Sequence, residues 1–374
     1  MSSFREAVID LDAIAHNLTR LRADIQTPHT MAVVKANGYG HGAVPVAHTA
    51  LAAGADWLGV ADIAEGIELR TAGIEAPILA WLHDPATDWA LAIDADIDLG
   101  VSSVRQLSDI AATATTLGRT ANVQIKLETG LSRNGVSEDD WPVLLALAAE
   151  CEQAGSIRVR GIFSHLSNAS AADDAAAIAC FDRGLAAAAS VGLAPTLIHL
   201  ASTAAAIRVP ASRYSMVRIG IGLYGLSPFD DATSADLGLI PAMTLRSQVA
   251  AVRRARAGAG VSYDYTWRAP EDVTLALIPL GYADGIPRQA SGKAPIALNS
   301  HTYAVTGRIA MDQFVVSVGQ DAVNVGDVSV LFGDPTSGVP SASDWADAAG
   351  TVNYEIVTRI GNRVVRTYLP VVGS

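Results

Sequence analysis

The sequence predicts an α/β protein in which an N-terminal (β/α)8 TIM barrel precedes a C-terminal mainly-β domain. Eight apolar runs rich in β-branched residues recur along the first part of the chain, as strands do. Segments rich in Ala, Leu and Glu with helical spacing separate these runs. Eight strand-then-helix units over roughly 230 residues match the size and period of such a barrel. After Ser227-Pro228 the pattern changes to short strands, which predicts the second domain.

Each barrel strand is expected where an apolar run begins. Runs such as MAVV, PILAWL and TLIHLA are apolar almost throughout, which is typical of parallel strands covered on both faces. The helices between them are expected over residues 44–53, 63–71, 104–117 and 139–154. The strands are expected to begin near Met31, Trp57, Pro77, Ile97, Asn122, Ile157, Thr196 and Met216.

Residues 10–240 form the barrel domain in this prediction, and residues 241–374 form the β domain. The segments of the second domain alternate apolar and polar residues between Gly, Pro and Asp turns, as antiparallel strands do. Helices are expected to interrupt it at about residues 343–349 and 354–360. Residues 1–9 precede the first helix, and we expect them to form a strand that pairs with the β domain.

The composition fits a globular protein and argues against several other classes. Half of the residues are hydrophobic, and at 374 residues the chain is too long for one ordinary hydrophobic core. A net charge of −12 argues against a nucleic-acid partner, and Arg253, Arg254 and Arg256 are expected at a solvated strand edge. No basic leader and no apolar stretch of about 20 residues stands out, so we expect a cytoplasmic protein without a membrane partner. The isolated Cys151 and Cys180 predict neither a disulfide nor a metal site.

The first apolar run ends in Lys35, which a glycine-rich turn follows at residues 36–42. Active sites of TIM barrels form at the carboxyl ends of the strands. A lysine in an apolar setting loses part of its preference for charge, so its amine becomes available for a Schiff base with a carbonyl. Taken alone, however, Lys35 fits a structural lysine that reaches solvent from a strand end better than it fits a catalytic one.

The other strand ends reverse that preference. They carry the runs KLETGLSRNG, FSH and HLAST, and the last strand supplies an arginine followed by GIGLYG. A mouth so rich in cations and N–H donors suits a phosphate together with a carboxylate. This predicts an enzyme that uses pyridoxal 5′-phosphate (PLP) on an amino acid. The side chains expected around the mouth are Lys35, Lys126, Arg133, His165, Ser202, Thr203 and Arg218.

Six runs carry a resemblance to a known family. AVVKANGYGHG, VRIGIGLYGL, VSYDYTW, GYADGIPR, GRIAMDQ and NYE resemble, in this order, segments of alanine racemases, and together they extend over nearly the whole chain. The resemblance implies PLP as cofactor and the interconversion of L- and D-alanine, which supplies D-alanine for bacterial peptidoglycan. It also implies a homodimer whose subunits share their active sites.

The resemblance assigns the catalytic roles to four residues. Lys35 would bind PLP and move the α-proton of D-alanine, while Tyr263 of the partner subunit would serve the L-enantiomer from the opposite face. Racemisation needs a base within reach of each face. A tyrosine with a pKa near 10 is a poor base at neutral pH, so His165 would link Tyr263 to Arg218. Arg218 would donate to the pyridine nitrogen and weaken the ring as an electron sink, which favours return of the proton to Cα over side reactions.

The resemblance also assigns the binding roles. Arg133 and the backbone N–H of the partner's Met311 would hold the substrate carboxylate. Lys126 resembles a lysine that several relatives carry as a carbamate, which would orient Arg133; without that modification we expect another neutralising partner beside Lys126. The phosphate would be held by Tyr39, Thr203, Tyr354 and the backbone N–H groups of Gly220 and Ile221, and Ser202 would also contact the cofactor.

The chain departs from the family pattern at three places. Ser202-Thr203 stands where Asn-Ser is usual, Glu128 stands for Asp, and Leu131-Ser132 stands for Met-Gly. These changes put the cofactor affinity and the shape of the substrate pocket in doubt.

Three other readings stay open. One is a racemase of broader amino-acid specificity, and another is a decarboxylase on the same plan, which would need only one catalytic face and so would not need both Lys35 and Tyr263. The third is a non-catalytic PLP-binding protein with a single barrel, which would not need the long β domain.

Overall fold

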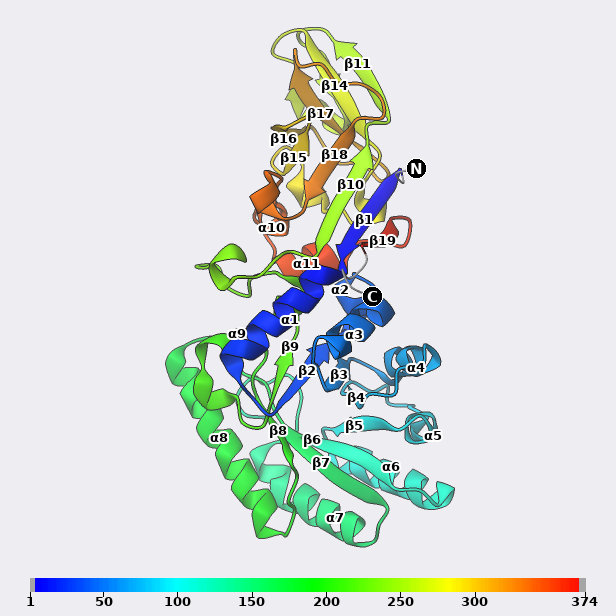
Figure 1. Ribbon diagram of the computed structural model, residues 1–374, viewed down its shortest axis with the longest axis vertical. Coiled ribbons are helices and arrows are strands. Elements are labelled where there is room, and N and C mark those ends of the chain that lie inside the picture. The colour runs from blue at the N-terminus through cyan, green and yellow to red at the C-terminus, as the bar shows by residue number, and fades with distance from the viewer. Residues whose placement is uncertain (1–3, 370–374) are drawn as a thin grey trace.

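The computed structural model describes residues 4–369. The molecule is elongated, with a barrel at one end and a β domain at the other (Figure 1). The first helix, α1 (Leu11–Ile25), begins at the junction between them and runs down the side of the barrel, where its apolar face joins the barrel core. Its N-cap is Asp10, whose side chain accepts a hydrogen bond from the Ala13 N–H at 3.0 Å, as an acidic cap should.

The barrel contains eight parallel strands in the order β8-β7-β6-β5-β4-β3-β2-β9. An isolated parallel bridge between Ser202 and Arg218 joins the two ends of this sheet. Each strand begins within about two residues of its predicted start, so the predicted barrel is confirmed. The strands are β2 (His29–Val33), β3 (Trp57–Val60), β4 (Ile78–Ala80), β5 (Ile97–Val101), β6 (Ala121–Lys126), β7 (Ile157–Phe163), β8 (Leu197–His199) and β9 (Met216–Ile219).

Helices cover the outside of the barrel. The predicted helices over residues 63–71 and 104–117 are confirmed at both ends. The helix expected from residue 139 begins at Trp141, after a 3-10 turn, because Pro142 lacks an N–H and is tolerated only in a first turn. The covering helices are α3 (Ala43–Ala52), α4 (Ile63–Thr71), α5 (Trp89–Asp94), α6 (Val104–Leu117), α7 (Trp141–Gln153), α8 (Ala171–Ser190) and α9 (Thr203–Arg208).

The β domain is built on a nine-stranded sheet in the order β11-β14-β17-β16-β15-β18-β10-β1-β19. Strand β1 (Arg5–Asp10) lies between β10 and β19, so the N-terminus pairs with this domain as expected. Residues 1–3 and 370–374, which the predicted domain boundaries include, lie outside the described residues. The other strands are β10 (Met243–Gln248), β11 (Ala251–Ala255), β14 (Val273–Ile278), β15 (Pro295–Leu298), β16 (His301–Thr306), β17 (Phe314–Gly319), β18 (Val328–Phe332) and β19 (Val365–Leu369).

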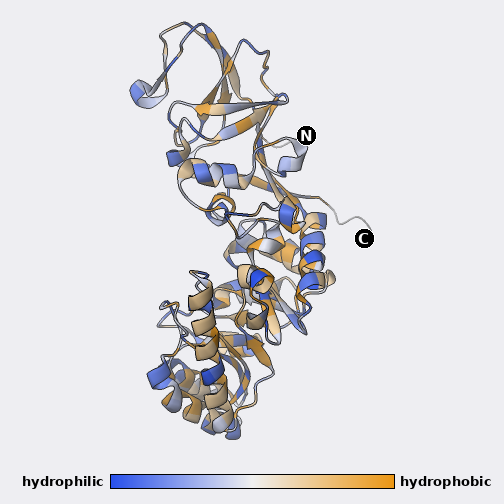
Figure 2. Ribbon diagram, turned by 90° about the vertical axis from the view of Figure 1, so that its left-hand side faces the viewer, coloured by the Kyte–Doolittle hydropathy of each residue, from blue (hydrophilic) through white to orange (hydrophobic). Residues whose placement is uncertain are grey.

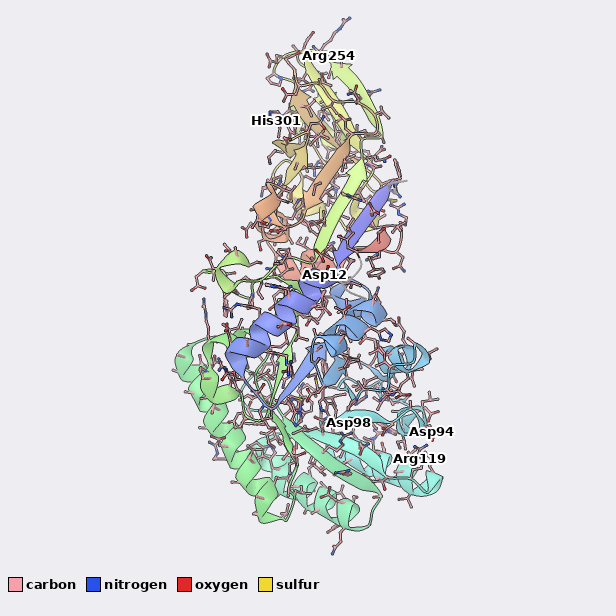
Figure 3. All side chains as sticks on the ribbon, viewed as in Figure 1. Asp12, Asp94, Asp98, Arg119, Arg254 and His301 are labelled. Atoms are coloured by element: carbon pink, nitrogen blue, oxygen red, sulfur yellow. The ribbon has the colours of Figure 1, made fainter. Side chains whose placement is uncertain are left out.

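Smaller elements complete the β domain. Strands β12 (Gly260–Val261) and β13 (Trp267–Arg268) form a separate hairpin. The two predicted helices are present as α10 (Ala342–Ala349) and α11 (Asn353–Thr358). The arginine cluster lies on β11 and just after it, at the sheet edge, where Arg254 is exposed at the far end of the molecule (Figure 3). The prediction of a solvated edge is therefore confirmed.

Each domain has its own hydrophobic core. The large core of the barrel domain lies between the strands and the surrounding helices, and a smaller apolar cluster that includes Met31, Trp57 and Phe163 fills part of the barrel interior. The β domain packs around Phe314, Phe332 and other buried side chains. Figure 2 shows hydrophobic colour on the strands and hydrophilic segments along the helices. Among the described residues no helix is long and apolar enough to cross a membrane.

Candidate active site

A cavity of about 1070 Å³ opens at the carboxyl ends of the barrel strands. This is the end of a TIM barrel where active sites form. Tyr263 and Met311 do not line the cavity, but the other residues that the sequence singled out all do. These are Lys35, Tyr39, Lys126, Arg133, His165, Ser202, Thr203, Arg218, Gly220, Ile221 and Tyr354.

Tyr263 and Met311 instead lie on the surface of the β domain. Their exposed fractions are 64% and 53%. Tyr263 begins a short 3-10 turn, and Asp264 beside it forms an ion pair with Arg308 at 2.9 Å. Large apolar side chains so exposed are typical of surfaces that bind another protein. The cavity of a single chain is thus formed without Tyr263 and Met311.

Lys35 begins a left-handed turn, not a right-handed helix. The segment α2 (Lys35–Tyr39) has φ angles of 53° at Ala36 and Asn37, 60° at Gly38 and 51° at Tyr39. For residues other than glycine this conformation costs roughly 1–2 kcal/mol each, so neighbouring contacts must hold it. The Ala36 N–H donates to Glu65 Oε1 at 2.6 Å, and the Asn37 Oδ1 accepts from the Ala43 N–H at 2.9 Å.

The surroundings of Lys35 favour its neutral amine. Its side chain lines the cavity, with Nζ 5.9 Å from the centre of the Trp81 ring. Burial lowers the pKa of Lys35, and the charge of Arg133 lowers it further, while Glu65 opposes the change. A lower pKa leaves more of the amine unprotonated near neutral pH, as a nucleophile or base requires.

Arg218 lies buried at the end of β9, with 6% of its surface exposed. Its Nη1 donates to His199 Nδ1 at 2.9 Å, and its Nη2 donates to His165 Nδ1 at 3.1 Å and to the Ser164 carbonyl at 2.7 Å. Burial and Arg133 lower the pKa of Arg218 to about 10, so the guanidinium stays charged at neutral pH.

His165 is neutral beside this cation. Burial lowers its pKa to about 3, with further contributions from Arg218 and Arg133. Because Nδ1 accepts a hydrogen bond from Arg218, the single ring proton of His165 lies on Nε2. His165 can therefore donate one hydrogen bond away from Arg218.

A second group of residues that line the cavity suits a phosphate group. Thr203 Oγ1 accepts from the Gly220 N–H at 3.0 Å, which leaves the hydroxyl hydrogen free to donate. The Gly220 N–H, which the sequence predicted as a phosphate donor, is thus directed at Thr203 in this structure. Burial raises the pKa of Tyr354 to about 12 and the pKa of Tyr39 even more, so both phenols remain donors. A Cβ at position 220 would lie 2.7 Å from the Tyr39 hydroxyl oxygen, so only glycine leaves room here.

The donor set as a whole fits PLP. Hydroxyl and amide donors suit its phosphate, and Lys35 offers the amine that its aldehyde needs. The cations Lys126, Arg133 and Arg218 line the same cavity, which suits the anionic cofactor and a substrate carboxylate.

Comparisons with known proteins agree along the whole chain. Residues 9–228 match the model of the alanine racemase N-terminal domain, and residues 242–368 match that of the alanine racemase C-terminal domain. The chain belongs to the alanine racemase family. It is 46% identical to the alanine racemase of Thermobifida fusca, over 98% of this chain and 99% of that protein. It is 48% identical to that of Mycolicibacterium smegmatis, over 98% and 95%.

Solved structures of alanine racemases have the same fold. The enzyme from D-cycloserine-producing Streptomyces lavendulae superposes with a TM-score of 0.97 at 44% identity, over 99% of this chain and 98% of that one. The alanine racemase of Streptomyces coelicolor gives 0.96 at 42% identity, over 98% of each chain. Both domains of this chain are therefore arranged as in these alanine racemases.

Lys126 forms no ion pair within the described part of this alanine racemase family member. Only 7% of Lys126 is exposed, and its Nζ lies 5.7 Å from the centre of the Phe163 ring. Burial lowers the pKa of Lys126 to about 8, with Arg218 and Arg133 contributing. No ion pair to Lys126 or Arg133 is found among residues 4–369, and the charge of Glu128 opposes the shift in the pKa of Lys126 without outweighing burial and the two arginines.

The structure shows the local setting of several departures from the family pattern. Glu128, where Asp is usual, accepts from the Gly130 N–H at 2.5 Å and the Ser132 N–H at 2.9 Å, so it closes its own loop. Ser132, where Gly is usual, has a φ of 56°, a conformation that glycine adopts without strain. Thr203 keeps the hydroxyl that a serine would provide.

The sequence did not reveal several residues around the site. Glu65, Trp81 and Tyr224 were not predicted, although Tyr224 stacks on Tyr39 with ring centres 4.7 Å apart. Asp62-x-x-Glu65 is a recognisable cap of α4, and the Asp62 side chain does accept from the Glu65 N–H. The cap pattern could have located Glu65, but not its contact with the Lys35 turn.

Proposed function

We propose that this chain interconverts L- and D-alanine with PLP bound to Lys35. The proposal depends above all on one cavity that contains a lysine with a lowered pKa, a phosphate-binding donor set and the cation Arg133. D-alanine formed in this way would serve bacterial peptidoglycan, as the family implies. A cytoplasmic location is part of the same proposal.

The residues of the cavity divide the work. When bound, PLP stabilises the electron pair that remains on Cα after the α-proton leaves. Lys35 accepts or returns this proton on one face, because its amine is neutral more often than that of an ordinary lysine. Arg133 pairs with the substrate carboxylate. Arg218 stays charged and holds its position through His165, His199 and backbone carbonyls.

The second face requires Tyr263 from a partner subunit. We propose a homodimer in which Tyr263 and the backbone N–H of Met311 enter the cavity of the other chain. Their exposure on the β domain supports this arrangement. His165 would then donate from Nε2 to the tyrosine oxygen and stabilise its deprotonated form, which makes the phenol a stronger acid and a usable base partner.

Isotope exchange tests the proposal. Purified enzyme incubated with L-alanine in heavy water should place deuterium on Cα of both enantiomers, and Lys35→Ala should abolish exchange. Borohydride should fix PLP to the wild-type protein but not to Lys35→Ala. Deuterium on one enantiomer alone would disprove the two-base reaction. Serine and other amino acids assayed in parallel would reveal a racemase of broader specificity.

A further inference from the structure

A chain of polar side chains crosses the interior of the barrel behind Arg218. TIM barrels normally fill this space with layers of branched apolar side chains. Here Asp98, Gln124 and His199 are at most 1% exposed. Asp98 lies on β5 within the barrel, away from the β domain, as Figure 3 shows. Buried polar groups are expensive unless they are all paired, so their pairing needs an explanation.

The pairing is continuous from Arg218 to Arg160. His199 Nδ1 accepts from Arg218 Nη1 at 2.9 Å, and His199 Nε2 lies 2.8 Å from Gln124 Oε1. Gln124 Nε2 donates to Asp98 Oδ2 at 2.8 Å. Asp98 Oδ1 accepts from Arg160 Nη1 at 3.0 Å. Strands β5, β6, β7, β8 and β9 each contribute one member, so five neighbouring strands share the chain.

The chemistry of the two ends dictates the direction of every bond. Arginine only donates hydrogen bonds, so a chain between Arg160 and Arg218 needs one member that only accepts. Asp98 is that member. Burial raises its pKa to about 6, and Arg160 and Gln124 oppose that rise, so the carboxylate is still mostly ionised at neutral pH. The amide of Gln124 must then face it with NH2 and face His199 with its oxygen. His199 is thereby left with its proton on Nε2 and a lone pair toward Arg218.

The neighbouring residues keep this geometry in place. A Cβ at Gly161 would lie 2.8 Å from Gln124 Oε1. The glycine is therefore needed to make room for the amide of Gln124, because its own φ is not in the left-handed region. Phe163 stacks on the His199 ring at 4.9 Å between centres and 3° between planes. Burial also lowers the pKa of His199 well below its usual value, which keeps the ring neutral.

We propose that Asp98, Gln124 and His199 are positioning residues. They hold the proton of His199 on Nε2, so that Nδ1 accepts from Arg218 and fixes the orientation of the Arg218 guanidinium in the cavity. Their effect on catalysis rests on the proposed function, in which Arg218 serves the cofactor. Their effect on His199 does not depend on it, because the ring can be examined in the protein without PLP.

Replacing one carboxylate oxygen of Asp98 with an NH2 group should reverse the directions of the hydrogen bonds between Asp98 and His199. In Asp98→Asn the amide oxygen faces Arg160, so its NH2 faces Gln124 and turns that amide around. The proton of His199 then moves to Nδ1 and opposes the Arg218 donor. The double variant Asp98→Asn/Gln124→Glu places an acceptor-only group one link nearer His199 and should restore the Nε2 proton. Simple loss of packing predicts no such recovery.

Nitrogen NMR of histidine-labelled, PLP-free protein tests the proposal directly. Wild type and the double variant should carry the His199 proton on Nε2, and Asp98→Asn should carry it on Nδ1. Asp96→Asn is the matched control. Asp96 is exposed, lies two residues before Asp98, and accepts a hydrogen bond from Asn122, which is not part of the hydrogen-bonded series from Arg218 to Arg160. It should leave His199 unchanged. A proton on Nδ1 in wild type, or on Nε2 in Asp98→Asn, would overturn the proposal, and the wild-type result needs no variant to fold.

Kinetics of the PLP-loaded protein give the second measurement. Asp98→Asn should lower kcat about tenfold or more, the effect of one opposed buried hydrogen-bonding pair, and leave the KM for alanine nearly unchanged because Arg133 is untouched. The double variant should recover most of kcat. Equal losses of kcat in the single and double variants would contradict a role for the chain in positioning Arg218.

Discussion

Lys126 is the residue whose charge fits its surroundings least. It is almost fully buried, it faces Arg133 and Arg218, and its pKa falls from 10.5 to about 8. Below pH 8 both the folded and the unfolded chain carry this charge, so the folded state bears the full cost of burying it. Between pH 8 and 10.5 only the unfolded chain keeps the proton, so stability rises with pH.

Replacing Lys126 with Met should therefore stabilise the PLP-free protein. We expect a gain of about 2 to 3 kcal/mol in the free energy of unfolding at pH 7, which shrinks above pH 8 and vanishes near pH 10.5. Urea unfolding of both proteins at pH 7 and pH 9.5, at equal concentration, measures it. If Lys126 carries a carbamate, the variant should instead be less stable at pH 7, because an anion between two arginines would be lost.

Single residues were predicted where chemistry and position coincide in the sequence. Lys35 and Arg218 stand at the ends of apolar runs, and the barrel prediction was enough to bring them to one mouth. Asp98 and Gln124 stand inside such runs, and the sequence does not show whether a polar side chain there points into the barrel or away from it. Their pairing depends on which residues of five strands share a layer, and strand register cannot be read from one strand at a time.

The Lys35 turn illustrates the same limit at the scale of an element. The eight barrel strands were predicted because apolar runs and helical spacing are local signals. The turn at residues 36–42 was predicted from its glycines, yet its left-handed backbone includes Ala36, Asn37 and Tyr39, none of which demands that conformation. Contacts from Glu65 and from the start of α3 impose it, and they depend on tertiary structure.

Asn37 should be the residue that stabilises this turn most. Its side chain accepts from the first N–H of α3, where Gly42 offers no side-chain cap. Asn37→Ala loses this bond and places alanine in a left-handed conformation, so we expect unfolding to become easier by about 1–2 kcal/mol. Asn37→Asp keeps an acceptor and should remain close to wild type. Equal stability of the two variants in thermal or urea unfolding would show that the cap contributes little.

At the scale of the whole molecule, the proposed role of Tyr263 would make the active site a property of two chains. The barrel cavity contains every predicted cofactor and carboxylate ligand except Met311. In an elongated molecule the β domain presents Tyr263 and Met311 to solvent, at 64% and 53% exposure. A symmetric dimer would let each chain complete the cavity of the other, as isologous interfaces do.

Mixed dimers should therefore regain activity that neither parent has. In the proposed dimer, Lys35→Ala and Tyr263→Phe should each inactivate both sites of their own dimer. A dimer with one subunit of each contains one site with an intact Lys35 and the partner's intact Tyr263, and its other site lacks both. Unfolding and refolding equal amounts together should give about one quarter of the wild-type rate, the statistical yield for random pairing in a twofold dimer.

Mixing Lys35→Ala with the double variant Lys35→Ala/Tyr263→Phe offers no intact site and should stay inactive. Failure of the first mixture to recover, with heterodimers demonstrated by native mass spectrometry, would mean that Tyr263 does not act across the interface.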